Sequence, residues 1–175
     1  MAHLTVNVEY GVHSLVCLAA SPVTLSSREL ADLQGIPPDP MAEILPKLEI
    51  AGIVRASEGV GGGYVLARSP DEITVMDIVD AVEGKKRLFE CQDIKSRCAI
   101  FGDSPPSWVT GGVCGIHAAI LRAEKAMRES LASQTLGDIM QTIGRKAPAE
   151  FSFPDEIRNW LDGQTAAPSH SKQIG

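Results

Sequence analysis

Residues 53–66 limit the possible folds most strongly, because a glycine run there separates two short apolar stretches. Ile53-Val54-Arg55 is typical of a β-strand, and Tyr64-Val65-Leu66 is typical of its returning partner. Between them, Gly59-Val60-Gly61-Gly62-Gly63 supplies the conformational freedom that a flexible tip requires. We therefore predict a β-hairpin over this segment.

Helical patterns precede the hairpin. Apolar residues at helical spacing predict three helices, over residues 6–20, 28–33 and 41–51. Ser26 and Glu29 have the spacing of a capping box at the start of the second helix. Gly35 is expected to end that helix, and Gly52 is expected to end the third.

Four prolines lie just before the third predicted helix or within it. The prolines at positions 37, 38 and 40 predict a rigid turn before the third helix, and Pro46 is expected to kink or shorten it. After the hairpin, residues 71–82 predict a fourth helix. Three helices followed by a hairpin are the order of a winged helix-turn-helix. We therefore expect a mostly α-helical fold with a small β wing (α+β).

The second half of the chain has a different pattern. Residues 84–113 show neither the apolar period of a helix nor that of a strand, whereas residues 114–136 predict one long helix. A small winged domain cannot cover the apolar stripe of this helix, so we expect packing against its copy in a homodimer. A last helix is expected at residues 153–161, anchored by Trp160, with disorder over residues 163–175. The stripe consists of Ile116, Ile120, Ala123, Met127 and Leu131. The expected units are residues 1–83, 84–113, 114–147 and 148–175.

Composition narrows the functional class. The 175 residues have room for one compact domain with an appended element, and no apolar run approaches the ~20 residues of a bilayer crossing. The first residues lack a basic signal-peptide region, so we expect a cytoplasmic protein. The net charge of −6 argues against a general polyanion binder. The charge is uneven, with 4 Lys/Arg against 12 Asp/Glu in residues 1–83 and 10 against 6 in residues 84–147.

The four cysteines are divided between two regions. Cys91, Cys98 and Cys114 lie in one Gly/Pro/Ser-rich stretch, with six and then fifteen residues between them, and His117 follows after two more. In reducing cytosol, clustered cysteines indicate metal ligands or redox centres. Thiolates suit iron–sulfur clusters or zinc, and imidazole can replace one thiolate. Cys17 stands apart in an apolar run, where a small core residue is expected.

These features occur in an order that resembles a known family. The segment Leu48-Glu49-Ile50-Ala51-Gly52-Ile53-Val54, the glycine run with Tyr64, and the cysteine loop with its long helix resemble IscR/NsrR/RsrR-type (Rrf2) winged-helix regulators over residues 4–140. The resemblance implies a dimeric bacterial transcription regulator that binds a double-stranded DNA operator and no small-molecule substrate. It also implies an iron–sulfur cluster that reports iron supply, nitric oxide or redox state, [2Fe-2S] in preference to [4Fe-4S].

The resemblance also implies a ligand set. Cys91, Cys98 and Cys114 would be the cysteine ligands, and the fourth ligand would be His117 or come from the first helix. Glu9 and His13 lie four residues apart on one face of that helix. Similar regulators combine such a pair from one subunit with cysteines of the other. The alternatives stay open: a solvated Glu–His pair, a structural zinc site, a thiol switch, or a packing role for His117.

The DNA-facing residues depart from the family pattern. The resemblance places DNA at the first turn of the third helix, with Asp39, and at the wing, with Gly62, Gly63 and Tyr64. Glu58 stands where similar proteins carry an arginine, and the third helix is acidic. Tyr64 serves equally well to close the wing, and the arginines equally well as solvated surface. The candidate phosphate contacts are Arg28, Lys47, Arg55 and Arg68.

The sequence favours a regulator over an enzyme. It contains no nucleophile elbow and no phosphate-binding loop with its lysine, and the glycine run lies between two strands. The acidic head motivates one alternative, a diverged winged-helix protein that acts through protein–protein contact. The cysteines motivate another, a cluster-free thiol or zinc sensor.

Overall fold

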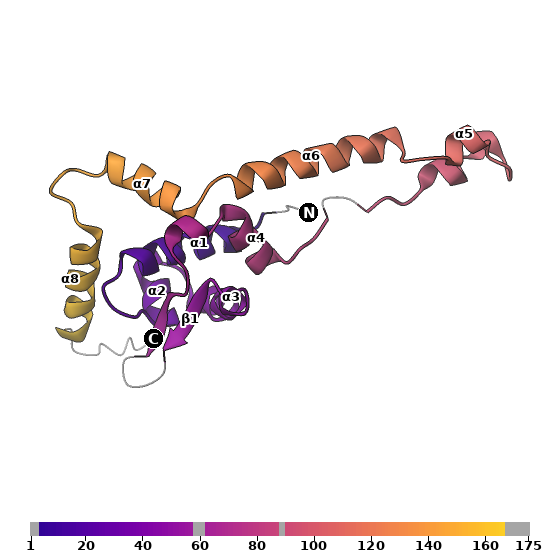
Figure 1. Ribbon diagram of the computed structural model, residues 1–175. Helices are drawn as coiled ribbons and strands as arrows, with labels where there is room; N and C mark the ends of the chain where they lie inside the picture. The colour runs from indigo at the N-terminus through magenta and orange to yellow at the C-terminus, as the bar shows by residue number, and fades with distance from the viewer. Residues whose placement is uncertain (1–3, 58–61, 88–89, 167–175) are drawn as a thin grey trace.

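The computed structural model describes residues 4–57, 62–87 and 90–166. Three helices precede a two-stranded antiparallel hairpin, and a fourth helix follows a 3₁₀ turn, η1 (Pro70–Glu72) (Figure 1). This order confirms the predicted winged helix-turn-helix and the mostly α-helical fold. We call residues 4–57 and 62–83 the head. Its elements are α1 (Val6–Ala20), α2 (Ser27–Gln34), α3 (Pro38–Ile50), β1 (Val54–Ser57), β2 (Gly63–Leu66) and α4 (Val75–Glu83).

Local capping explains where the short helices begin and end. Ser26 and Glu29 form the predicted capping box of α2, and Gly35 ends it with φ 64°. The fourth helix begins at Val75 and not at residue 71 as predicted. Thr74 and Asp77 form a capping box there, which satisfies the first backbone N–H groups of α4 at that point.

Two of the expectations for the prolines around α3, a turn before the helix and a helix shortened at Pro46, are wrong. The helix begins at Pro38, so Pro38 and Pro40 belong to its first turn, where the missing N–H would have had no partner. Pro46 does not shorten α3, which continues to Ile50. Fully buried side chains on both sides of Pro46, including Ile44 and Leu48, hold the helix against the head.

The wing is wider than a hairpin. β1 pairs with β2 in the register Val54↔Leu66 to Ser57↔Gly63. Leu25 extends the sheet on the other side of β2, since its N–H donates to the Tyr64 carbonyl (3.2 Å) and its carbonyl accepts from the Tyr64 N–H (2.8 Å). A Cβ on Gly63 would lie 2.6 Å from the Leu25 carbonyl carbon. Gly63 is therefore required by close backbone packing.

The head has a continuous apolar core between α1, α3 and α4. Its side chains follow the predicted helical faces, because residues three and four apart point to the same side. Residues far along the chain also belong to it: Leu136 is fully buried and Ile157 is 5% exposed. The largest fully buried side chains are Leu15, Leu25, Leu30, Met41, Ile44, Leu45, Leu48, Ile53, Ile73, Ile78 and Leu136.

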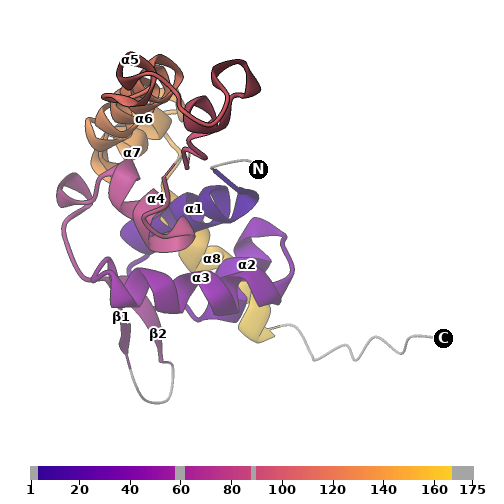
Figure 2. The same cartoon turned by 90° about the vertical axis from the view of Figure 1, so that its right-hand side faces the viewer.

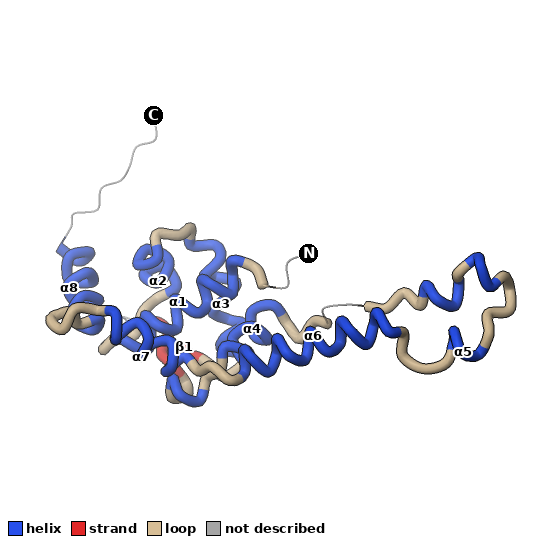
Figure 3. Tube along the Cα trace, turned by 90° about the horizontal axis from the view of Figure 1, so that it is seen from above, coloured by secondary structure: helices blue, strands red, loops and turns tan. Residues whose placement is uncertain are grey.

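A long helix extends away from the head. We call residues 90–132 the arm; it contains the turns η2 (Ile94–Arg97) and η3 (Ala99–Phe101), the short helix α5 (Ser107–Thr110) and α6 (Gly115–Ala132). Figures 1 and 3 show α6 projecting from the head with α5 at its far end. In Figure 2 the wing and the arm lie at opposite ends of the molecule. No residue of α6 is buried in the single chain.

The chain returns to the head after α6. The predicted helix 114–136 is present as α6 but ends at Ala132, four residues early. Thr135 and Asp138 then form a capping box that starts a separate helix, α7 (Leu136–Lys146). The Leu136 N–H donates to the Ile73 carbonyl (2.8 Å), which fixes α7 beside η1. The last helix, α8 (Phe153–Ala166), is longer than predicted and includes residues 163–166. The rest of the predicted disordered tail lies outside the described residues.

The anchor of α8 also differs from the prediction. Trp160 is only half-buried, whereas Ile157 is 5% exposed and Leu161 packs against the head core. Both aliphatic residues lie on the face of α8 that meets α1.

An ion pair joins α6 to α4. The guanidinium of Arg128 donates to both carboxylate oxygens of Asp80, at 3.1 and 2.7 Å. The two side chains are 34% and 17% exposed, so solvent screens the pair only in part. This contact attaches the base of the arm to the head.

We expect Arg128→Met to lower the free energy of unfolding by about 1 kcal/mol, because the Asp80 carboxylate loses two charge-assisted hydrogen bonds while the aliphatic stem is kept. Urea denaturation of Arg128→Met, Asp80→Asn and the double variant measures the coupling energy. The control cycle is Lys125→Met, Glu129→Gln and their double variant, since the Lys125–Glu129 pair is exposed and its atoms lie 3.6 Å apart. A coupling energy no larger than that of the control would contradict the prediction.

Candidate metal centre and nucleic-acid interface

The three clustered cysteines meet in one cavity in the arm. Cys91, Cys98 and Cys114 all line a cavity of about 430 Å³, together with His117. Although fifteen residues separate Cys98 from Cys114, the third cysteine thus borders the same cavity as the other two. η3 and α5 take up this stretch, so that its two ends lie on the same cavity. The other lining residues are Gln92, Asp93, Ile94, Lys95, Phe101 and Ile116.

The position of Cys114 favours its thiolate. Cys114 is the N-cap residue of α6. The backbone N–H of His117, and then that of Ile116, lower the pKa of the Cys114 thiol, and the nearby Lys95 ammonium adds to this effect. Helix N-termini stabilise thiolates in this way, and the thiolate is the form that binds metals.

The candidate ligands of α1 do not line this cavity. Glu9 and His13 are exposed on the outer face of α1, in the head. Cys17, one turn further, packs at the edge of the head core, as expected for a small core residue. Burial raises the pKa of the Cys17 thiol. Within the described ranges, no three His, Cys, Asp or Glu side chains of one chain are already arranged to hold a metal ion.

The opposite pKa shifts predict different thiol reactivities. In metal-free protein, we expect the alkylation of Cys114 by iodoacetamide to reach half its limiting rate at a lower pH than that of a free thiol, and the alkylation of Cys17 at a higher pH. The sign follows because only the thiolate reacts: a lowered pKa populates it earlier as pH rises, and a raised pKa later. Mass spectrometry of peptides across a pH series measures both profiles. The prediction would be contradicted if Cys17 reached half its limiting rate at the same pH as Cys114 or at a lower pH.

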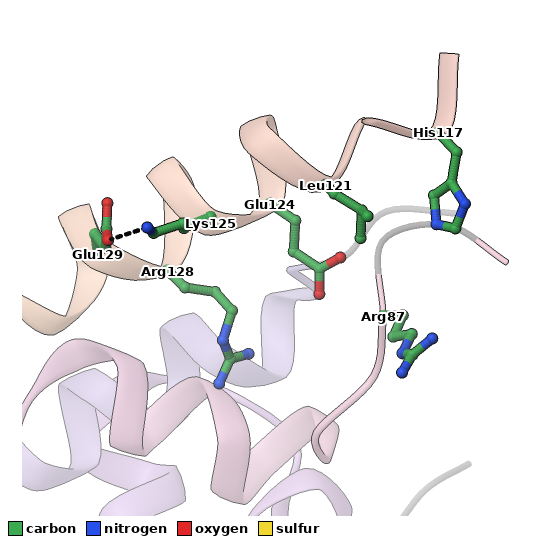
Figure 4. A pocket seen from close by; sticks show the side chains of 7 residues that line it. All are labelled: Arg87, His117, Leu121, Glu124, Lys125, Arg128 and Glu129. Atoms are coloured by element: carbon green, nitrogen blue, oxygen red, sulfur yellow. Dashed lines mark ion pairs between the residues drawn. The ribbon is translucent and has the colours of Figure 1, made fainter. Parts of the chain in front are cut away.

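A second cavity follows α6. It measures about 490 Å³ and lies between α6 and the chain that leaves α4 (Figure 4). His117 lines this cavity and also the cysteine cavity, so it lies where the two meet. The lining charges are mixed, and Lys125 is paired with Glu129. The lining residues are Arg87, His117, Leu121, Glu124, Lys125, Arg128 and Glu129.

On α3, Lys47 is predicted to contact DNA phosphate, but its ammonium is paired with groups of the same chain. Its ammonium donates to Glu43 Oε1 (2.6 Å) and to the Val82 carbonyl at the end of α4 (3.2 Å). Asp39 is exposed in the first turn of α3, as a DNA-facing residue would be, but it carries a negative charge. The α3 surface therefore offers few free cations to phosphate.

The other predicted contacts divide into exposed and structural residues. Arg28 is exposed near Asp32 (4.0 Å), and Arg55 is exposed on β1. Tyr64 forms the backbone pairing with Leu25 and packs against the core, and Gly63 lies close to the Leu25 backbone. Gly62 is half-buried before β2. Glu58 and the tip residues 59–61 lie outside the described residues.

Arg68 follows β2, and its side chain contacts η1 and α4. Its guanidinium donates to the Glu72 carbonyl (3.3 Å) and lies 4.0 Å from the Asp77 carboxylate. Sequence reasoning missed three further charged residues: Lys95 in the cysteine cavity, and the Arg128–Asp80 pair. The pair joins positions 48 residues apart, so no local pattern marks it. For Lys95 the only signal is its position between two candidate ligands.

Comparison with known proteins identifies the family. A family model described as Rrf2, iron-dependent transcriptional regulator, matches residues 4–142. The chain belongs to the Rrf2 family. This match confirms the resemblance that residues 48–54, the wing and the cysteine loop indicated. The chain is therefore a transcriptional regulator with a winged-helix fold. Within the described ranges, no helix is both long and apolar enough to cross a membrane.

Individual Rrf2 relatives support the same assignment. The HTH-type regulator Rv1287 of Mycobacterium tuberculosis is 36% identical over 78% of this chain and 80% of its own. The HTH-type transcriptional repressor NsrR of Streptomyces coelicolor is 27% identical over 78% and 87%. Among solved structures, CymR of B. subtilis, described as its global cysteine regulator, has a TM-score of 0.60 with 25% identity and covers 81% of this chain and 98% of that one. IscR of T. potens has a TM-score of 0.58 with 26% identity, at 85% and 93%.

Proposed function

We propose that this Rrf2 regulator is a homodimeric, cytoplasmic repressor whose operator affinity depends on an iron–sulfur cluster held in the arm. The observation that carries the proposal is the convergence of Cys91, Cys98 and Cys114, with His117, on one cavity. Three thiolates and one imidazole form a donor set that iron–sulfur chemistry accepts. The likeness to IscR and NsrR supports this cofactor.

The residues of this chain suit the cluster in three respects. The cysteines are free, the cavity is larger than a single ion requires, and the N-terminus of α6 favours the thiolate at Cys114. When bound, the cluster supplies one-electron redox chemistry and reactivity toward nitric oxide. We favour [2Fe-2S], because one histidine or one carboxylate is available to complete three cysteines; zinc is the alternative metal.

The fourth ligand has two candidate sources. His117 lines the cavity in the same chain. Glu9 and His13 are exposed on α1 and lie outside that cavity, so they would have to come from the second copy. In that arrangement the cluster would join the arm of one subunit to the head of the other, and loss of the cluster would change the geometry of the two heads.

The apolar surface of α6 supports the dimer. No residue of this 18-residue helix is buried within the chain, and Ile116 is 71% exposed. Packing α6 against its copy would remove this surface from water, which is the main favourable term in stable helix pairing. The Arg128–Asp80 pair would then transmit a movement of α6 to α4 and the head.

Anaerobic purification tests the cluster directly. We expect broad visible absorbance and matched amounts of iron and acid-labile sulfide in protein purified or reconstituted without oxygen. Size-exclusion chromatography with light scattering on the same sample measures the dimer. A colourless protein that contains no iron after reconstitution would reject the cluster, and bound zinc would reassign the site.

The acidic α3 surface favours one second candidate function, a diverged head that acts through protein–protein contact. Asp39 is exposed where a cation would serve DNA, and Lys47 is paired with Glu43. A salt titration of operator binding separates the two functions, because each phosphate contact makes the binding constant fall more steeply with salt. A steep negative slope supports operator binding; no binding at low salt supports the second candidate.

The cysteines also fit a cluster-free thiol sensor, and the likeness to CymR, described as a global cysteine regulator, favours this variant of the site. Such a sensor would keep its redox response after iron chelation. A response that chelation abolishes would assign sensing to the metal.

A further inference from the structure

The segment between Cys98 and Cys114 must be closed before Cys114 can share a site with the other cysteines. These fifteen residues contain three glycines and two prolines. A loop of this length and composition has many open conformations, and ordering it costs conformational entropy. Specific contacts are therefore needed to hold its end beside Cys91 and Cys98.

One set of contacts folds the middle of the segment. Phe101 and Trp108 stack edge to face, with ring centroids 5.7 Å apart. Val109 is 8% exposed although it lies outside the head core, and α5 packs against η2. These contacts hold α5. The Gly111 N–H ends α5 by donating to the Ser107 carbonyl (2.7 Å), and Gly112, with φ 67°, turns the chain toward Cys114.

Lys95 makes the contact that reaches this end. Its ammonium donates to the Gly112 carbonyl (2.8 Å) and to the Thr110 carbonyl (3.2 Å). These carbonyls precede Cys114 by two and four residues. Lys95 belongs to η2, between Cys91 and Cys98, and its side chain lines the cysteine cavity. One half-buried side chain thus connects the segment that carries the first two cysteines to the segment that carries the third.

The base of this connection is itself constrained. Asp93 has φ 48°, a left-handed conformation that is uncommon outside glycine, and it begins η2. Arg97 closes the turn, with its guanidinium donating to the Gln92 carbonyl (2.7 Å). Lys95 therefore projects from a defined turn between the first two cysteines.

We propose that Lys95 is a positioning residue that holds Cys114 beside Cys91 and Cys98 and so completes the candidate metal site. The proposal rests on the proposed function only for the identity of the metal. The position of Cys98 and Cys114 on one cavity in metal-free protein is independent of it. Two hydrogen bonds from a charged donor favour the closed loop over the open ones.

The first experiment measures thiol proximity without any metal. In a chain with Cys17→Ser and Cys91→Ser, only Cys98 and Cys114 remain, and phenylarsine oxide binds tightly only where two thiols can reach one arsenic. We expect Lys95→Met to weaken this binding about tenfold, since the hydrogen bonds to both carbonyls are lost. Lys95→Arg keeps the charge and the donors and should restore most of the affinity. Lys125→Met is the matched control on α6 and should bind as the parent does.

The second experiment measures loading of the full chain with native cysteines. Lys95→Met should retain less iron and sulfide after anaerobic reconstitution than Lys95→Arg, with unchanged far-ultraviolet circular dichroism. Arsenical binding by Lys95→Met equal to that of the parent would overturn the positioning role, whatever the cluster does. If the parent itself binds no iron but loses arsenical affinity on Lys95→Met, the positioning role stands and the cluster proposal fails.

Discussion

Replacing Cys98 or Cys114 with serine should prevent binding of the proposed iron–sulfur cluster. We expect the iron and sulfide content of either variant to fall about tenfold or more after anaerobic reconstitution, because serine supplies a hard, protonated oxygen where a soft thiolate is needed. Both residues line the arm cavity, and the N-terminus of α6 favours the thiolate at Cys114. The visible spectrum with iron and sulfide assays on one sample measures the effect.

Cys17→Ser is the matched control for these variants. Cys17 packs beside the head core, outside the arm cavity, and should be dispensable for iron. Retention of wild-type iron by both Cys98→Ser and Cys114→Ser, or loss of iron from Cys17→Ser at unchanged stability, would contradict the assignment. If iron is lost from the Cys98 and Cys114 variants and kept by Cys17→Ser, then Glu9→Ala, His13→Ala and His117→Ala distinguish the two sources of the fourth ligand.

Gly63→Ala should destabilise the head by about 2–3 kcal/mol, the upper range for overpacking at a tight site. The added Cβ would lie 2.6 Å from the Leu25 carbonyl carbon and 2.7 Å from its oxygen. Both atoms belong to the backbone, so no side-chain rotation relieves the contact. The strands must separate, which breaks the two hydrogen bonds between Leu25 and Tyr64. Urea denaturation followed by circular dichroism measures the free energy of unfolding.

Gly144→Ala is the opposite case and serves as the control. Gly144 lies within α7, and a Cβ there would meet open space. Alanine should stabilise the protein by about 0.5–1 kcal/mol, since it removes backbone freedom from the unfolded chain. A Gly63→Ala variant as stable as the parent would show that the pairing of Leu25 with Tyr64 is not rigid. The wing glycines would then serve flexibility alone.

The two glycine variants also bear on function. Gly63→Ala should displace the wing. We therefore expect this variant to bind the operator more weakly, even at temperatures where it is folded. The predicted role of Gly63 at DNA and its observed role at Leu25 are thus separable. Binding at reduced affinity with an unchanged salt slope would indicate a shape effect, and a reduced slope would indicate lost phosphate contacts.

Local interactions made much of the head predictable. The capping box of Ser26 with Glu29 and the left-handed conformation of Gly35 depend only on residues within about one turn. The sequence pattern and the structure therefore agree there. The hairpin is predictable for the same reason, because strand period and glycine content are local properties. The clustering of three cysteines indicated a metal or redox site, and the family resemblance implied the ligand set; which of these residues bind metal stays a prediction.

Predictions were wrong where a distant contact decided the outcome. The break between α6 and α7 depends on Leu136, which is fully buried against the head and bonded to Ile73. The continuity of α3 through Pro46 depends on the core that Ile44 and Leu48 enter. In both cases burial outweighs the local pattern, since each buried aliphatic side chain contributes about 1.5–3 kcal/mol.

The chain's own pattern thus determined the kinds of elements, their order and the candidate donors, because these depend on neighbours within a few residues. Tertiary structure alone decided which charged groups are available and which distant residues meet. Lys47 is paired with Glu43 and the end of α4, and so it is not a free cation on the DNA-facing helix. Lys95 joins two segments fifteen or more residues apart and brings Cys114 to the cavity. Such contacts follow from the path of the whole chain, and no local periodicity encodes them.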